Sequence, residues 1–225
     1  MSLFIIHCIF ICIFHFHFLP VNITLSNTGK RYNREWIFRN FTFTFLQGRS
    51  YAITGANGSG KSTLLQIIAG AVMHSEGKID YTNEASGKAI SSETEYSQIS
   101  FAAPYLDLIE EMTANEFLDF HSGFKPFTLT FPEILSAVGL TEAANKQIRY
   151  FSSGMKQRLK LAQSFFSNTS VLLLDEPATN LDEEGISLYK KLLKEHSAGR
   201  LVIISSNDKE EYEDCSEVIA IGNYK

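Results

Sequence analysis

The sequence is poor in cysteine, with only Cys8, Cys12 and Cys215 among its 225 residues. No Cys-x-x-Cys pair is present, so a structural zinc site or a disulfide framework is not expected, and a reducing compartment fits. An excess of positive charge is also missing, because 20 Lys and Arg residues face 25 Asp and Glu residues, for a net charge of −5. This balance argues against a broad nucleic-acid-binding surface.

Charged residues are absent from residues 1–20, MSLFIIHCIFICIFHFHFLP. A signal peptide begins with basic residues and ends in small ones, and this segment has neither. A membrane span needs about 20 apolar residues, whereas three histidines interrupt this run. We expect residues 1–20 to lie outside the fold, with translation from a downstream codon such as that of Val21 as one explanation. A signal or membrane anchor is the alternative.

Residues 21–225 have the pattern of one α/β domain, long enough to bury a core without disulfides. Polar and apolar residues alternate over Val21–Leu25 and Phe41–Leu46, which predicts half-buried antiparallel strands. Val171–Leu174 and Leu201–Ile204 are uninterrupted apolar runs, typical of central parallel strands that are covered on both faces.

The strongest chemical signal is a glycine-rich segment between a short strand and a helix predicted over Thr63–Val72. Its residues are Gly55, Ala56, Asn57, Gly58, Ser59, Gly60, Lys61, Ser62 and Thr63, called the phosphate loop below. They match the nucleotide-binding pattern G-x-x-x-x-G-K-[ST] in its required context. The glycines allow backbone angles and close approaches that a Cβ would block, so backbone N–H groups can face phosphates. We expect Lys61 to reach the β- and γ-phosphates and Ser62 to take a Mg²⁺ position.

A second signal is the acidic pair Asp175-Glu176, which directly follows the apolar run at 171–174. Asp175 is therefore expected at the carboxyl end of a buried strand, the edge where ligands bind in open α/β sheets, and there it can hold Mg²⁺. Glu176 points elsewhere and can orient or deprotonate an attacking water molecule. A plain helix cap is the alternative, but the phosphate loop upstream favours the catalytic interpretation.

A third segment, FSSGMKQR at residues 151–158, begins a helix predicted to run to about Phe166. A serine-rich turn before a helix is either an anion-binding N-terminus or only a helix cap. Taken alone, this segment favours the cap.

The order of these segments resembles the ATP-binding subunit of ABC transporters. GANGSGKST, FSSGMKQR, LLLDEP and then Ala178-Thr-Asn-Leu-Asp182 follow one another within residues 21–225, and FSSGMKQR begins about 20 residues before the acidic strand. The resemblance implies an α/β P-loop NTPase (RecA-like) core with an antiparallel β subdomain and a helical subdomain at about 105–166. It also implies ATP and Mg²⁺ as cofactors, with ATP hydrolysis as the activity.

The resemblance assigns further roles to particular residues. It implies that the family signature, which contacts ATP bound to a second subunit, consists of Ser152, Ser153, Gly154 and Met155. Ser153 and Met155 depart from the Leu-Ser-Gly-Gly-Gln pattern of the family. Asp182 matches the D-loop aspartate that crosses between subunits, and it is expected to support catalysis by Glu176 and Lys61.

The adenine base needs an aromatic partner, which the family supplies upstream of the phosphate loop. Tyr32 is similar in context and is expected to stack on the base. Trp36 is the alternative, although as the single tryptophan it could simply belong to the core.

Two family residues are missing. Ala103 or Pro104 occupies the place of a glutamine that contacts Mg²⁺, and Gln98 lies at the wrong end of that strand. Asn207 replaces a histidine that contacts the γ-phosphate, and His196 precedes the relevant strand. Asparagine can donate a hydrogen bond but cannot carry charge or shuttle a proton. We therefore predict slowed, not abolished, hydrolysis in which Asn207 still takes part.

The resemblance also implies partners, because one copy supplies half a site on each of two faces. We expect an ATP-bound homo- or heterodimer that drives a separate transmembrane permease chain, on the cytoplasmic face of the inner (cell) membrane and without nucleic acid. Docking is expected at Pro104–Met112, where Tyr105, Leu106, Leu108 and Ile109 are apolar. An ordinary amphipathic helix start is the alternative there. Export is favoured over import, and the cargo is determined by the partner.

Two other functions stay open at this point. One is a dimerisation switch that binds ATP and barely hydrolyses it, which the residues at 103, 104 and 207 suggest. The other is an ABC-type ATPase that acts on ribosomes or DNA without any transporter. Such proteins usually carry two ATPase cores or long inserted arms, for which 205 residues leave no room.

Overall fold

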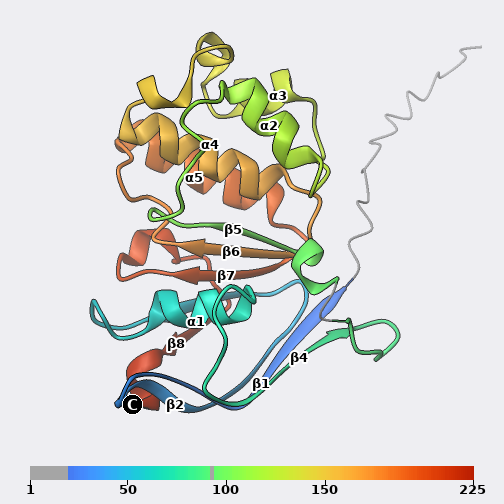
Figure 1. The fold of residues 1–225 in the computed structure, drawn as a ribbon, viewed down its shortest axis with the longest axis vertical. Helices are drawn as coiled ribbons and strands as arrows, with labels where there is room; N and C mark the ends of the chain where they lie inside the picture. The colour runs from blue at the N-terminus through green and yellow to red at the C-terminus, as the bar shows by residue number, and fades with distance from the viewer. Residues whose placement is uncertain (1–19, 92–93) are drawn as a thin grey trace, which may run out of the picture.

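The computed structural model describes residues 20–91 and 94–225. Within these ranges, eight strands form two sheets, and helices pack around the larger sheet (Figure 1). The expectation for residues 1–20 concerns a segment that, apart from Pro20, lies outside the described residues. Among the described residues, no helix has both the length and the apolar character that a membrane crossing requires.

The smaller sheet is antiparallel, in the order β2-β1-β4, with β1 at Val21–Tyr32, β2 at Glu35–Phe45 and β4 at Glu76–Asn83. β1 and β2 are both longer than the strands that the alternation of polar and apolar residues predicted. Their pairing register shifts after Leu25, and Asn27 and Asn40 adopt left-handed backbone conformations with φ of 49° and 54°. Such irregularities turn the following side chains to the opposite face, so the two-residue period breaks.

The larger sheet is parallel, in the order β5-β6-β7-β3-β8. Its strands are β3 (Ser50–Thr54), β5 (Ile99–Ala102), β6 (Val171–Asp175), β7 (Leu201–Ser205) and β8 (Glu217–Ala220). Every residue of β6 and β7 is buried, which confirms the prediction of central strands. Because all five strands run in the same direction, the loops that follow β3, β6 and β7 meet at one edge of the sheet.

Alternate residues of β6 contribute to two separate hydrophobic cores. Leu172 and Leu174 pack with the helices α2 to α5, whereas Val171 and Leu173 pack with α1 and the antiparallel sheet. Figure 1 accordingly shows α4 and α5 on one side of β5–β7 and α1 on the other. Burying one such leucine stabilises the fold by about 1.5–3 kcal/mol, so both faces of the sheet hold the strand ends in place.

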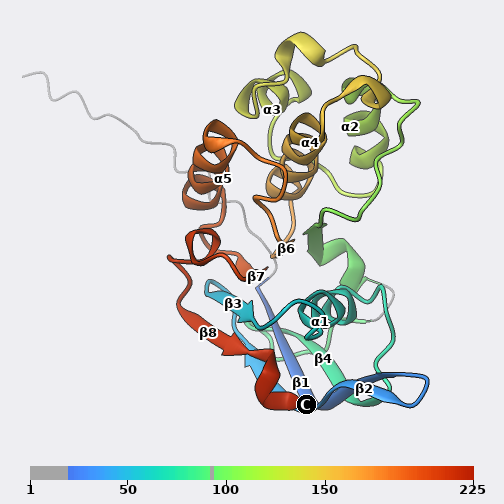
Figure 2. The same cartoon turned by 90° about the vertical axis from the view of Figure 1, so that its left-hand side faces the viewer.

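The helices are α1 (Lys61–Ile68), α2 (Ala114–Ser122), α3 (Phe131–Ala137), α4 (Ser153–Phe166) and α5 (Glu183–His196). α1 begins two residues earlier than predicted, directly after Gly60, and it ends before Gly70, whose φ is +72°. Capping boxes formed by Thr113 with Glu116 and by Thr130 with Glu133 start α2 and α3. Figure 2 shows α2 beside α4 and α3 above it, at the end of the molecule away from the antiparallel sheet.

Candidate nucleotide-binding site

The phosphate loop joins the end of β3 to the start of α1. Gly60 caps α1 with a φ of 105°, and a Cβ built there would lie 2.6 Å from Cγ2 of Ile37. A glycine is needed at this position both for the backbone angle and for the close approach of β2. α1 therefore starts at the loop itself. The N–H groups of its first turn have no partner within the helix, so they are suited to bind an anion there.

A pocket of about 200 Å³ opens at the phosphate loop. Its lining consists of Ile37, Asn57, Gly58, Ser59, Gly60, Lys61, Ser62, Thr63 and Glu176. All of these except Ile37 are predicted from the sequence as site residues. Ile37 is missed because an apolar residue in a strand carries no chemical signature, and only the fold brings β2 against Gly60.

Lys61 is almost fully buried at 5% exposure, and its ammonium group is held inside the phosphate loop. Its Nζ donates to the carbonyl oxygens of Gly55 at 2.8 Å and Ala56 at 3.4 Å. A buried ammonium group that is bonded to neutral carbonyls is well placed to bind an anion, since charge-assisted bonds are stronger. Gly55 and Ala56 thus contribute to the site by orienting Lys61.

Asp175 ends β6 at 1% exposure, and neither carboxylate oxygen has a hydrogen-bond partner at ordinary geometry among the described residues. A buried carboxylate with few donors around it is costly, and a divalent cation lowers that cost. The Asp175 carboxylate and the Ser62 hydroxyl are oxygen ligands of the kind Mg²⁺ takes. The residues present therefore fit a magnesium ion.

Tyr105 has an unexpected place in this part of the site. Burial raises the pKa of its hydroxyl, and the neighbouring Asp175 carboxylate raises it further. The sequence indicates Tyr105 only as a docking residue, because its distance from Asp175 in the chain hides their proximity in the fold. Pro104, which precedes it, accepts a hydrogen bond at its carbonyl oxygen from Nζ of Lys160 at 2.6 Å.

Glu176 lines the pocket although it directly follows Asp175. Its backbone is left-handed, with a φ of 42°, and its N–H donates to the carbonyl oxygen of Ser205 at 2.8 Å. A non-glycine residue in this conformation is strained, and such strain is concentrated at functional sites. The turn explains how two consecutive carboxylates can point in different directions, as the sequence predicts.

Asn207 follows β7 and reaches the phosphate loop. Its Nδ2 donates to Oδ1 of Asn57 at 2.8 Å, and Asn57 lines the pocket. The structure therefore brings Asn207 next to the phosphate loop, and its role at the γ-phosphate stays a prediction.

The predicted signature begins α4, where Ser152 is the N-cap and its Oγ accepts a hydrogen bond from the Met155 N–H at 3.2 Å. Ser152 and Ser153 are exposed, whereas Gly154 and Met155 are partly buried. None of these four residues lines the pocket of the same chain.

Asp182 is the N-cap of α5 and does not line the pocket either. Its Oδ1 accepts from the Gly185 N–H at 2.8 Å and from Nη2 of Arg158 at 3.2 Å. The Gly185 N–H and the Arg158 guanidinium lower the pKa of Asp182, so it stays charged. Arg158 thereby links α4 to the start of α5.

Tyr32 and Trp36 lie in the β1–β2 hairpin, outside the pocket lining. Tyr32 is 48% exposed, and Nζ of Lys30 lies 4.7 Å from its ring centroid. The guanidinium carbon of Arg39 lies 4.0 Å from the ring centroid of Trp36, which is partly buried and does not belong to the core. Stacking of Tyr32 on adenine stays a prediction.

Comparison with known proteins identifies the family, since the sequence profile of the family described as ABC transporter matches residues 38–179. The chain belongs to the ABC transporter family. The relative YybJ, an uncharacterized ABC transporter ATP-binding protein of Bacillus subtilis (strain 168), is 32% identical over 192 residues, covering 84% of this chain and 87% of YybJ. CcmA of Nitrosococcus oceani, a cytochrome c biogenesis ATP-binding export protein, is 33% identical over 187 residues, covering 82% of this chain and 85% of CcmA.

A solved structure of the ATP-binding subunit of an ABC transporter superposes with a TM-score of 0.76 at 23% identity, covering 89% of this chain and 86% of that subunit. At this identity the likeness shows the fold. The predicted ABC-type α/β fold, with its RecA-like core, antiparallel sheet and helical part, is thereby confirmed. The resemblance to ABC transporter ATP-binding subunits, a family that binds and hydrolyses ATP, is confirmed as well.

Proposed function

We propose that this chain is the ATP-hydrolysing subunit of a membrane exporter, which it powers by ATP-driven dimerisation. The observation that carries the proposal is the placement of Glu176 in the pocket of the phosphate loop, beside Lys61 and Ser62. A carboxylate that faces a phosphate-binding loop is suited to activate water, whereas a simple binding protein needs none.

In the mechanism that we propose, each residue has a separate task. Lys61 and the N–H groups at the start of α1 bind the phosphates of ATP. Ser62 and Asp175 would hold Mg²⁺, which offsets negative charge on the phosphates when it is bound. Glu176 orients a water molecule toward the γ-phosphate and accepts its proton. Asn207 donates a hydrogen bond at the γ-phosphate.

The placement of the signature supports a dimer. Exposed Ser152 and Ser153 start the 14-residue helix α4, whose N-terminus is suited to an anion, yet they do not line the pocket of their own chain. In a homo- or heterodimer they would face the ATP held by the partner, with Asp182 beside the interface. Hydrolysis would then open the dimer, a rigid-body movement of the kind that drives many switches.

The partner that receives this movement is proposed to be a separate transmembrane permease chain. Tyr105, Leu106 and Ile109 are 45%, 37% and 38% exposed within Pro104–Met112 and offer apolar contact. Binding there would place the chain as a peripheral protein on the cytoplasmic face of the cell membrane. The export function in the name of CcmA supports export over import.

A switch that binds ATP with little hydrolysis is the second candidate. It is favoured by Asn207, which lies where the ABC resemblance expects a histidine, and by Ala103 or Pro104, one of which lies where it expects a glutamine. Steady-state ATP turnover of the full chain separates the two candidates, because a switch forms ATP-dependent dimers without turnover above that of Glu176→Gln.

Asn207→His is expected to raise the turnover number about 10-fold, because imidazolium adds a charge-assisted hydrogen bond worth about 1.4 kcal/mol in the transition state. Steady-state phosphate release measures the change. Asn145→His, at an exposed position of the helical part, is the matched control. Equal turnover in wild type and Asn207→His would show that the asparagine does not slow hydrolysis.

A further inference from the structure

One peptide group next to the catalytic pocket is held at both of its ends by side chains. It joins Pro177, the residue that follows Glu176, to Ala178. Its carbonyl oxygen accepts a hydrogen bond from Nε2 of Gln157 at 2.8 Å, and its N–H donates to Oε1 of Glu211 at 2.8 Å. Loop peptides are ordinarily bonded to solvent or to the backbone, so two side-chain partners on one peptide are unusual.

The two side chains that hold this peptide group are buried, with 2% exposure for Gln157 and 7% for Glu211. Gln157 lies on α4, one turn after the exposed serines of the signature, and Glu211 ends the 3₁₀ helix η4 (Lys209–Glu211) that follows Asn207. The peptide group therefore connects the signature helix and the segment after β7 to the loop that carries Glu176. Because the bond from Gln157 is buried and the bond to Glu211 is partly buried, water replaces either of them poorly.

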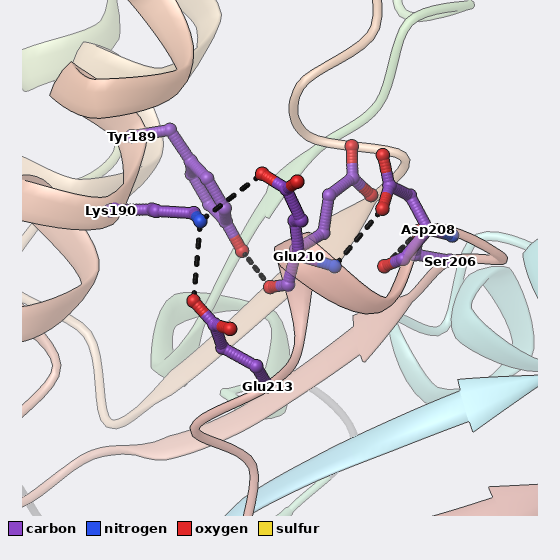
Figure 3. Close-up of polar contacts among 7 residues, drawn as sticks. Tyr189, Lys190, Ser206, Asp208, Glu210 and Glu213 are labelled. Atoms are coloured by element: carbon purple, nitrogen blue, oxygen red, sulfur yellow. Dashed lines mark hydrogen bonds and ion pairs between the residues drawn. The ribbon is translucent and has the colours of Figure 1, made fainter.

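The segment that carries Glu211 is itself fixed to α5. The Tyr189 hydroxyl donates to the carbonyl oxygen of Glu211 at 2.7 Å. Figure 3 shows Nζ of Lys190 between the carboxylates of Glu210 and Glu213, at 3.3 Å and 3.2 Å. Glu211 is thus anchored through its backbone, which leaves its side chain to hold Ala178.

The chemistry of Glu211 is also unusual for a purely structural residue. Its Oε2 is buried and has no hydrogen-bond partner at ordinary geometry among the described residues. Burial raises the pKa of Glu211, while Ser206 and the Ala178 N–H act against that rise, and the nearby Asp208 and Glu176 carboxylates add to it. A hydrophobic side chain would avoid the cost of burying a carboxylate. The presence of Glu211 here is therefore explained by the hydrogen bond that it accepts from Ala178.

The strained backbone of Glu176 gives that bond a consequence. A φ of +42° persists only where the surroundings determine it, and the restrained Pro177–Ala178 peptide group lies one residue beyond Glu176. Losing either bond would allow the turn to relax, and the carboxylate would leave its place in the pocket.

We propose that Gln157 and Glu211 are positioning residues that together hold the Pro177–Ala178 peptide group and thereby fix the Glu176 carboxylate for catalysis. Movement of the signature helix or of the segment after β7 then reaches the catalytic base through one peptide group. This inference rests on the proposed ATP hydrolysis by Glu176.

The first test compares ATP turnover in the full chain. Glu211→Leu and Gln157→Leu are expected to lower kcat about 10-fold or more with the KM for ATP changed less than about 2-fold, since they displace the base and not the phosphate loop. Glu211→Gln is expected to retain at least about a third of kcat, because its amide oxygen still accepts from Ala178. Lys209→Leu is the matched control, an exposed neighbour on the same 3₁₀ helix.

The second test is hydrogen exchange at the Ala178 amide without nucleotide, followed together with the melting temperature. Exchange is expected to be at least about 10-fold faster in Glu211→Leu and unchanged in Lys209→Leu. Unchanged exchange, or a kcat of Glu211→Leu within about 3-fold of wild type, would overturn the proposal. If Glu211→Leu does not fold, Gln157→Leu carries the same turnover test. If the wild type shows no turnover but its Ala178 amide is protected from exchange, the proposed hydrolysis is contradicted. The two hydrogen bonds that hold the Pro177–Ala178 peptide group are then still supported.

Discussion

Glu176→Gln is expected to lower the kcat for ATP hydrolysis about 1000-fold, the largest effect of any single substitution in this chain. Glu176 lines the phosphate-loop pocket with its backbone strained at a φ of 42°, so its carboxylate is placed to accept a proton from water. Glutamine has nearly the same shape but accepts no proton at neutral pH, and losing a general base costs about 100- to 10,000-fold. Phosphate release under steady-state conditions measures the change.

The same variant should bind ATP with wild-type affinity, because the phosphate loop and Asp175 are untouched. Fluorescence titration with a labelled ATP analogue measures that affinity. Turnover within about 10-fold of wild type would assign the base to another group, and a parallel loss of ATP affinity would make Glu176 a binding residue.

Lys61→Met is expected to weaken ATP binding at least about 100-fold. The Lys61 ammonium group is 5% exposed and bonded to the carbonyl oxygens of Gly55 and Ala56, so it brings a desolvated positive charge to the phosphate position. Methionine keeps much of the apolar stem but removes the charge. Losing charge-assisted bonds to a phosphate costs about 3 kcal/mol, which is roughly 100-fold in the dissociation constant.

The measurement for Lys61→Met is calorimetric titration with ATP and Mg²⁺, with Lys88→Met at an exposed position of the chain as the matched control. The control should bind ATP as the wild type does. Wild-type affinity in Lys61→Met would show that the phosphates lie elsewhere in the protein.

The parts of the candidate site that could be placed together from the sequence are those joined by a local motif or by the ends of parallel strands. The phosphate loop lies between β3 and α1, and Glu176 lines the same pocket because parallel strands end at one edge of the sheet. A local pattern and one topological rule were therefore enough to assemble them.

The missed contributors depend on contacts between distant segments. Ile37 approaches Gly60 from β2, and Tyr105 lies near Asp175, whereas Gln157 and Glu211 meet at one peptide group. Ile37, Tyr105 and Glu211 have no chemical pattern in their own neighbourhood, and the segment FSSGMKQR around Gln157 does not reveal its partner. Only the folded chain shows what these residues contact.

Secondary structure follows the same division. The buried strands β6 and β7 were predicted because apolar runs leave few alternatives. β4 and β8 were not predicted, since neither is an apolar run or alternates regularly: most of β4 is partly buried, and β8 buries only Ile219. Irregular pairing near Asn27 and Asn40 hid half the length of β1 and β2, because it disrupts the alternation of side chains.

The central claim, an ATP-driven dimer, is tested most directly by the mass in solution of the full-length Glu176→Gln variant. Sedimentation or light scattering would be recorded with and without ATP, alongside Lys61→Met under the same conditions. The account predicts the mass of two chains for Glu176→Gln only when ATP is present, and of one chain for Lys61→Met throughout. A Glu176→Gln variant that binds ATP but keeps the mass of one chain, and that joins its permease as one copy only, would contradict the account.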